Sequence, residues 1–117
     1  MNIESYREYC ITKKGVTESF PFDNKTLVFK VMNKMFALTD VDEFTGINLK
    51  CDPERAMTLR EKYTGIQPGY HMNKTHWNTV ATQEDVNDQL LKELIDHSYE
   101  LIVASLPKKL QTELKSL

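Results

Sequence analysis

Residues 26–51 read TLVFKVMNKMFALTDVDEFTGINLKC. Two runs in this stretch, residues 26–32 and 35–41, are rich in Val, Leu, Phe and Met, and only Asn33-Lys34 separates them. Such a short connection between apolar runs predicts a tight β-hairpin, because Asn tolerates the left-handed backbone that these turns need. We therefore expect two antiparallel strands with Lys34 at the tip of their turn.

The rest of the chain extends this hairpin into a mixed fold. Ile47, Leu49 and Cys51 alternate with polar residues, which predicts a strand with one buried face. Asp52 followed by Pro53 then signals the start of a helix. Extended segments follow at residues 66–72 and 77–80, and helical periodicity marks residues 3–14 and 82–106. The predicted class is α+β: an antiparallel sheet of five to six strands, helices largely on one face, an N-terminal helix and a helical C-terminus.

Within the C-terminal helical region, Thr82 and Asp85 resemble a capping box at the helix start. Arg55 and Arg60 are interpreted as solvated charges on the outer face of the preceding helix. His97 is interpreted as a half-buried histidine held by a carboxylate. The acidic loop at residues 40–46 lacks the spacing of a calcium-binding loop and is interpreted as solvated.

Length and composition bound the class of protein. A chain of 117 residues with 40% hydrophobic and 27% charged residues is typical of one globular domain, spanning residues 1–117. No apolar run reaches the length of a membrane span, and the N-terminus does not resemble a signal peptide. We expect a cytoplasmic monomer that does not bind membranes.

The cysteine and charge patterns argue against a metal-binding protein and against a protein that coats nucleic acid. Cys10 and Cys51 lie far apart without metal-ligand spacing, so we expect free buried thiols, no metal and no cofactor. The net charge of −2 argues against a protein that coats nucleic acid non-specifically. The charge is uneven, however: residues 1–80 carry +1 and residues 81–117 carry −3, which leaves room for a local basic face.

Residues 68–80, PGYHMNKTHWNTV, concentrate side chains suited to recognition. They include the only Trp and two of the three His of the chain. One interpretation is a binding surface formed by amphipathic side chains. The other is a structural strand–turn–strand, with Tyr70 and Trp77 in the core and the histidines on its rim.

Five segments in order resemble one family. They are SFPF (residues 19–22), LVFKV with KMFAL (27–38), LKCDPE (49–54), PGYHMNKTHWNTV (68–80) and DHSYELIV (96–103). On these motifs the chain resembles the MmcQ/YjbR family of small bacterial proteins, nearly along its whole length. The resemblance implies a CyaY-like, double-wing type of DNA-binding fold, and it implies no catalytic residues.

No catalytic arrangement is apparent in the sequence. There is no glycine-rich phosphate loop and no nucleophile elbow. Cys51 with His71 or His76 could form a thiolate pair in principle, but Cys51 falls in the buried phase of its strand beside Asp52, which disfavours the thiolate. We expect a protein that is not an enzyme.

Two hypotheses for function remain. In the first, the turns at Met32-Asn33-Lys34 and Met72-Asn73-Lys74 act as wings that bind DNA. The residues assigned to this interface are Lys30, Asn33, Lys34, Lys50, His71, Asn73, Lys74, His76 and Trp77. In the second, the aromatic and histidine-rich segment binds a protein or a small molecule, aided by adaptable methionines. Lysines gathered on one face would favour DNA, whereas scattered lysines and an apolar pocket near Trp77 would favour the second hypothesis.

Overall fold

A computed structural model describes all residues 1–117. The elements in chain order are α1 (Ile3–Ile11), β1 (Val16–Ser19), β2 (Thr26–Val31), β3 (Lys34–Asp40), β4 (Gly46–Lys50), α2 (Pro53–Lys62), β5 (Ile66–Pro68), β6 (Trp77–Ala81), α3 (Asp88–Ser105) and α4 (Lys108–Lys115). The strands form one antiparallel sheet in the order β1-β2-β3-β4-β6-β5. The predicted α+β class with up to six strands is confirmed.

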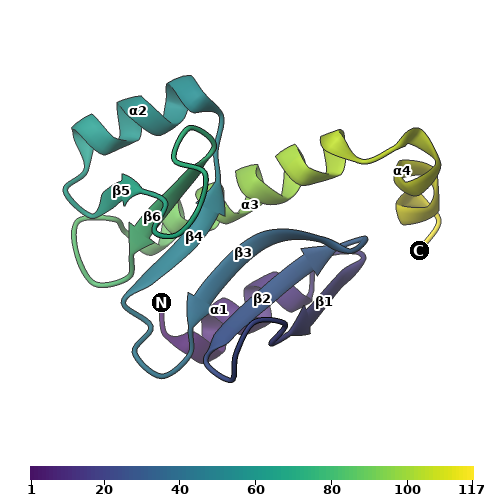
Figure 1. Ribbon diagram of the computed structural model, residues 1–117, viewed down its shortest axis with the longest axis horizontal. Helices are drawn as coiled ribbons and strands as arrows, with labels where there is room; N and C mark the ends of the chain where they lie inside the picture. The colour runs from purple at the N-terminus through teal and green to yellow at the C-terminus, as the bar shows by residue number, and fades with distance from the viewer.

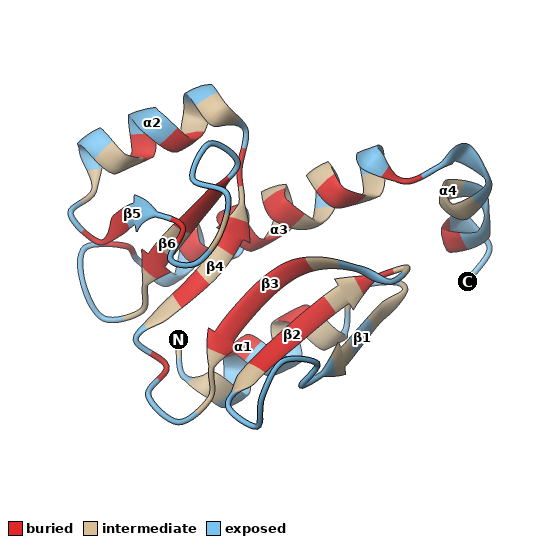
Figure 2. Cartoon of the chain, in the orientation of Figure 1, coloured by how far each residue is buried: buried red, intermediate tan, exposed pale blue.

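The helices cover one face of this sheet. In Figure 1, α1 and α3 lie behind the strands. The main core contains 21 buried residues, among them Phe29 and Ile47 from the sheet and Tyr6 and Ile95 from the helices. Figure 2 shows buried segments along the central strands and on part of α3, with exposed positions on the outer helical surfaces. The opposite face of the sheet carries no helix, as the prediction of helices largely on one face requires.

The tight turn between β2 and β3 lies one residue earlier than predicted. Val31 pairs with Lys34, so the turn residues are Met32 and Asn33, with φ angles of 47° and 72°. Both angles lie in the left-handed region that tight hairpins use. Met32 adopts this backbone while its side chain packs against the main core. Lys34 therefore opens β3 rather than standing at the tip, and the expected Asn33-Lys34 turn is wrong.

An irregular position in β3 is hydrogen-bonded by a side chain of α3. The pairing of β2 with β3 shifts between Phe29 and Lys30, which leaves Phe36 as an extra residue. The hydroxyl of Ser98, fully buried, donates to the Phe36 carbonyl at 2.6 Å and accepts from the Lys50 amide at 2.9 Å. A single side chain of the helix thus satisfies backbone groups of two adjacent strands.

The long C-terminal helix begins later than the sequence suggests. Asn87 caps α3 by accepting from the Leu90 amide at 2.8 Å, and the helix continues unbroken to Ser105. The predicted capping role of Asp85 is wrong. Its carboxylate accepts from the Thr64 and Gly65 amides, each at 2.8 Å, in the turn between α2 and β5. These hydrogen bonds, the one from Gly65 first, lower the pKa of Asp85.

The start of α2 agrees with the sequence pattern. Asp52 caps α2 through the Arg55 amide, and Pro53 occupies its first turn, as predicted. None of the helices combines the length and apolar character needed to cross a membrane.

Candidate binding groove on the helix-free face of the sheet

The strand register determines which side chains point away from the helices. Leu49 and Ile47 of β4 belong to the main core, so their neighbours Asn48 and Lys50 lie on the opposite face. Asn48 pairs with Leu38 on one side and with Thr79 on the other, and Lys50 pairs with Trp77. Side chains of paired residues share a face, so these residues form two adjacent rows on the helix-free side.

A small apolar cluster stands at the centre of this face. Val28, Leu38 and Trp77 are buried there, and Met35 and Met72 pack against them. Trp77 is only 9% exposed, although no helix covers it. Part of its cover comes from Met72, in the connection between β5 and β6.

This connection folds back over the sheet. The Asn48 side-chain amide donates to the Tyr70 carbonyl at 3.1 Å, and the Tyr70 amide donates to the Thr79 hydroxyl at 2.9 Å. Gly69 allows the close approach, because a Cβ atom at this position would lie 2.8 Å from Cβ of Trp77. His71 follows with a left-handed φ of 58°, which turns the chain over the sheet.

A groove of about 800 Å³ opens beside this connection. Its apolar lining comes from Phe22, Met35, Leu38, Tyr70 and Met72, and its polar lining includes Thr26, Asn48, His71 and Thr79. Asp40 and Glu43 also line it, and no Lys or Arg does. The volume falls in the range of small-molecule sites, and Phe22 and Tyr70 are largely exposed beside it at 64% and 69%.

The lysines assigned to DNA binding separate in the structure. Lys30 pairs with Met35 and Lys50 pairs with Trp77, so both lie on the helix-free face. Lys34 pairs with Val31, a residue of the main core, and strand alternation directs it toward the other side. Asn33 remains exposed at the hairpin turn.

The second predicted wing uses its polar groups internally. The Lys74 ammonium donates to the Gly69 carbonyl at 2.8 Å. The Asn73 side chain accepts from the Thr75 and His76 amides at 3.0 and 3.2 Å, which closes the turn. These contacts hold the connection between β5 and β6 in its folded-back conformation.

Arg60 belongs to this same scaffold, and its interpretation as a solvated charge is wrong. Its Nε donates to Oδ1 of Asn78 at 2.7 Å, and its Nη2 donates to the carbonyls of Lys74 and Trp77. Asn78 is 2% exposed, so its side-chain oxygen depends on this donor. The guanidinium ties α2 to the start of β6 and to the turn before it.

The sequence identified some groove residues and missed others. His71 lines the groove, with its ring centroid 4.0 Å from that of Tyr70. Asp40 and Glu43 come from the loop interpreted as merely solvated, and Phe22 comes from a distant segment. The alternation of Leu38 and Asn48 within their strands was the available signal for the face, but nothing local indicated that these segments share one groove.

The surroundings of His97, Cys51 and Cys10 shift the pKa of each side chain. The Nε2 atom of His97 accepts from the Asp52 amide at 3.2 Å, so the predicted carboxylate partner is wrong. Burial, and then the charge of Arg55, lower the pKa of His97. Burial raises the pKa of Cys51, and it raises that of Cys10 to about 12. No group of three or more His, Cys, Asp or Glu side chains is arranged to share a metal ion.

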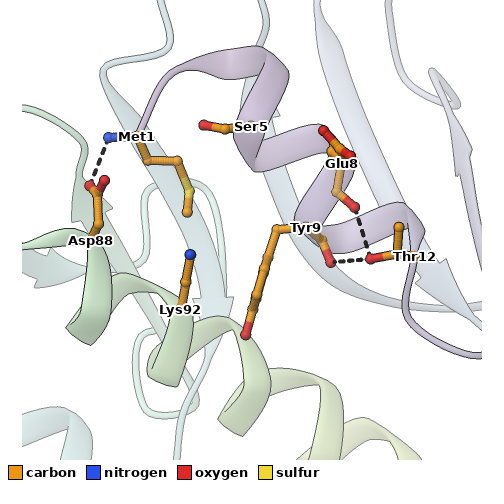
Figure 3. A pocket seen from close by; sticks show the side chains of 7 residues that line it. All are labelled: Met1, Ser5, Glu8, Tyr9, Thr12, Asp88 and Lys92. Atoms are coloured by element: carbon orange, nitrogen blue, oxygen red, sulfur yellow. Dashed lines mark hydrogen bonds and ion pairs between the residues drawn. The ribbon is translucent and has the colours of Figure 1, made fainter.

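A second, smaller hollow of about 330 Å³ lies between α1 and α3 (Figure 3). Glu8 and Tyr9 of α1 and its C-cap residue Thr12 border it on one side, and Asp88 and Lys92 border it from α3. It is lined largely by polar side chains, and it lacks the apolar floor of the groove on the helix-free face.

Comparison with known proteins assigns the chain to a family. The family model for YjbR matches residues 11–101. The chain is 34% identical to the uncharacterised protein YjbR of Escherichia coli strain K12, over 93% of each chain. It is 39% identical to the uncharacterised protein YbdF of Escherichia coli O157:H7, over 82% of this chain and 80% of YbdF.

Solved structures agree with this assignment. The crystal structure of the Deinococcus radiodurans protein DR2400, a DUF419 domain, superposes with a TM-score of 0.91 at 40% identity, covering 97% of this chain and 88% of that one. A Pseudomonas syringae protein superposes with a TM-score of 0.74 at 31% identity, covering 86% of this chain and 98% of that one. With its sequence and fold both matched, the chain belongs to the YjbR family.

Proposed function

We propose that this YjbR-family chain is a non-enzymatic binding protein whose ligand occupies the groove on the helix-free face. The observation that carries the proposal is the groove itself, about 800 Å³ with an apolar floor at Met35, Leu38 and Met72. Sites of this size with a few convergent polar groups are the usual form of small-molecule sites. The methionines provide an adaptable surface for an apolar ligand.

Charge distribution supports this proposal over a phosphate-binding surface. Lys34 is directed away from the groove, and the ammonium of Lys74 donates to a carbonyl within its own loop. No Lys or Arg lines the groove. Scattered lysines together with an apolar pocket near Trp77 are the arrangement that we expected for a protein that binds a ligand rather than DNA. The proposal keeps a cytoplasmic location, since Cys10 and Cys51 are free thiols, the state that a reducing compartment maintains.

The test is a fragment screen followed by amide-resolved NMR. The probe is a library containing cationic, neutral and anionic fragments in equal shares. Binding should shift the amides of Leu38, Asn48 and Thr79, which face or border the groove. The hairpin turn at Met32 and Asn33, outside the groove lining, should show no shift.

A matched pair of variants sharpens this screen. Met72→Trp places a larger side chain in the groove and should abolish binding of the fragments found with the wild type. Met57→Trp makes the same change on the exposed surface of α2, where Met57 is 61% exposed, and should leave binding unchanged. A library with no binder in any charge class, or binders indifferent to Met72→Trp, would refute the proposed groove.

DNA binding is the second candidate, and one specific observation favours it. Lys30 and Lys50 share the helix-free face, and the turns at Asn33 and Asn73 lie at the same end of the sheet. Lysines arranged this way could contact phosphates, with Asn33 near the backbone of a duplex. The overall charge of −2 indicates that any such binding is weak at physiological salt.

A salt titration against a short duplex and a single strand tests this candidate. For duplex DNA the logarithm of the binding constant falls with the logarithm of salt by about 0.9 per phosphate contact. The double variant Lys30→Ala/Lys50→Ala should therefore show a slope shallower by about two units. Lys108→Ala/Lys109→Ala, which removes two exposed lysines of α4, is the control. Absence of binding at low salt, or equal slopes in all three proteins, would eliminate the DNA candidate.

A further inference from the structure

Most threonine hydroxyls that line the groove have their protons engaged within the protein. Three of its threonines use their protons within the protein. Thr26 donates to Oδ2 of Asp23 at 3.2 Å, Thr39 donates to the Gly46 carbonyl at 2.8 Å, and Thr79 donates to Oδ1 of Asn48. These three hydroxyls therefore offer a ligand lone pairs that can accept a hydrogen bond, but no free proton.

The carboxylates of the groove add unpaired negative charge. Oδ1 of Asp40 accepts from the Asp42 and Glu43 amides at 2.9 and 3.2 Å, which fixes this carboxylate at the groove margin. Oδ2 of Asp40 and the Glu43 carboxylate take part in no hydrogen bond or ion pair of the folded chain. With no Lys or Arg in the lining, the groove carries a net negative charge beside an apolar floor.

Building on the proposed binding function, we propose that the ligand is a small organic cation, with an ammonium or guanidinium head near Asp40 and Glu43 and an apolar or aromatic body over Leu38 and Met72. The carboxylates complement the head by charge and by accepting its hydrogen bonds. The exposed aromatic rings of Phe22 and Tyr70 provide apolar walls and faces that attract a cation. The volume of about 800 Å³ selects a small molecule rather than a folded partner.

Three probes that share one apolar body and differ in the charge of the head group test this assignment. They are phenethylamine, phenethyl alcohol and phenylpropionate, each titrated into the full chain by calorimetry or NMR. Attraction between unit charges about 4 Å apart in a solvated site corresponds to about five-fold or more in affinity. Phenethylamine should bind at least about five-fold more tightly than the alcohol, and phenylpropionate more weakly than both.

Neutralising the groove carboxylates distinguishes a loss of charge attraction from a loss of folding. The double variant Asp40→Asn/Glu43→Gln should weaken phenethylamine about five-fold or more and leave phenethyl alcohol unchanged. Asp42→Asn is the matched control, because Asp42 is exposed in the same loop but does not line the groove. Equal weakening of the amine and the alcohol would indicate a structural effect and overturn the assignment.

The remaining outcomes distinguish the two proposals. If phenethylamine does not bind, or binds no more tightly than the alcohol or the anion, the ligand is not a cation. Groove-directed neutral or anionic binders in the fragment screen would then leave the binding function standing, whereas a screen without binders in any class would remove both proposals.

Discussion

At the scale of single residues, Arg60 shows how one side chain holds a candidate site in place. Its guanidinium donates to the buried Asn78 side chain and to the carbonyls of Lys74 and Trp77. All three acceptors belong to β6 or to the turn before it, and that turn leads back to the residues covering the groove. The planar fork of arginine suits such a set of acceptors better than the point charge of lysine.

We expect Arg60→Ala to lower the free energy of unfolding by about 1–3 kcal/mol, because it leaves the buried side-chain oxygen of Asn78 without its donor. It also removes a hydrogen bond from the carbonyls of Lys74 and Trp77, although the Trp77 carbonyl keeps the Gly69 amide as a donor. Urea denaturation measures this change. Lys62→Ala, on the exposed side of the same helix, should stay within about 0.5 kcal/mol of the wild type. Equal effects of the two substitutions would mean that the contacts of Arg60 contribute nothing specific.

At the scale of elements, the hairpin between β2 and β3 depends on two residues with left-handed backbone. Asn33 at φ 72° is one of the few residue types that tolerate this region, and Gly tolerates it better. Asn33→Gly should therefore preserve or slightly raise the stability. Asn33→Ala should lower the free energy of unfolding by about 1 kcal/mol, as measured by thermal or urea denaturation.

Lys34→Ala is the control for this turn, because Lys34 has an ordinary strand backbone and is exposed. Its stability should match that of the wild type within about 0.5 kcal/mol. A loss at Lys34 comparable to that of Asn33→Ala would place the strained turn at the Asn33-Lys34 pair instead.

The contact of α3 with the irregular part of β3 rests on Ser98. Ser98→Ala removes the acceptor of the Lys50 amide and the donor to the Phe36 carbonyl inside the core. We expect a loss of about 1–3 kcal/mol in the free energy of unfolding, the usual cost of unsatisfied buried backbone groups. Hydrogen exchange should show faster exchange at the Lys50 amide.

Ser105 provides a control on the same helix. Its hydroxyl donates only to the Ile102 carbonyl of α3, and the residue is exposed. Ser105→Ala should therefore leave both the stability and the exchange at Lys50 unchanged. If Ser98→Ala behaved like Ser105→Ala, the bridge between the helix and the two strands would be energetically unimportant.

At the scale of the whole molecule, His97 couples folding to pH. The folded state favours the neutral ring, because Nε2 accepts from the Asp52 amide and because burial, and then the charge of Arg55, lower the pKa of His97. The unfolded state has the ordinary value of 6.5 and so binds a proton more readily. This contribution to stability is complete above pH 6.5 and declines as the pH falls from there to the lowered pKa of the folded state.

Urea denaturation between pH 8 and pH 5 tests this coupling in wild type and His97→Gln. The glutamine side chain can still accept from the Asp52 amide, but it does not titrate. The wild type should lose stability relative to His97→Gln as the pH falls below about 6.5. Parallel pH profiles for the two proteins would show that His97 does not contribute to this dependence.

The predictions that succeeded rest on short-range patterns. The alternation of Ile47, Leu49 and Cys51 gave the correct strand and the correct buried face, and Asp52-Pro53 gave the correct helix start. These signals depend on backbone geometry and on residues a few positions apart, which the sequence contains in full. The predicted position of the β2–β3 turn was wrong by one residue. Met32 adopts a left-handed backbone that suits its residue type poorly, and its side chain packs against the core there.

The sequence by itself therefore determined the α+β class, the buried face of β4 and, through its motifs, the resemblance to the YjbR family. The tertiary structure alone decided which side chains share the groove, that the Lys74 ammonium is used within its own loop, and that Asp85 binds the turn at Gly65 instead of capping a helix. The physical reason is distance along the chain. Contacts such as Asn48 with Tyr70, 22 residues apart, depend on how the whole sheet assembles and leave no periodic signal in the residues that make them.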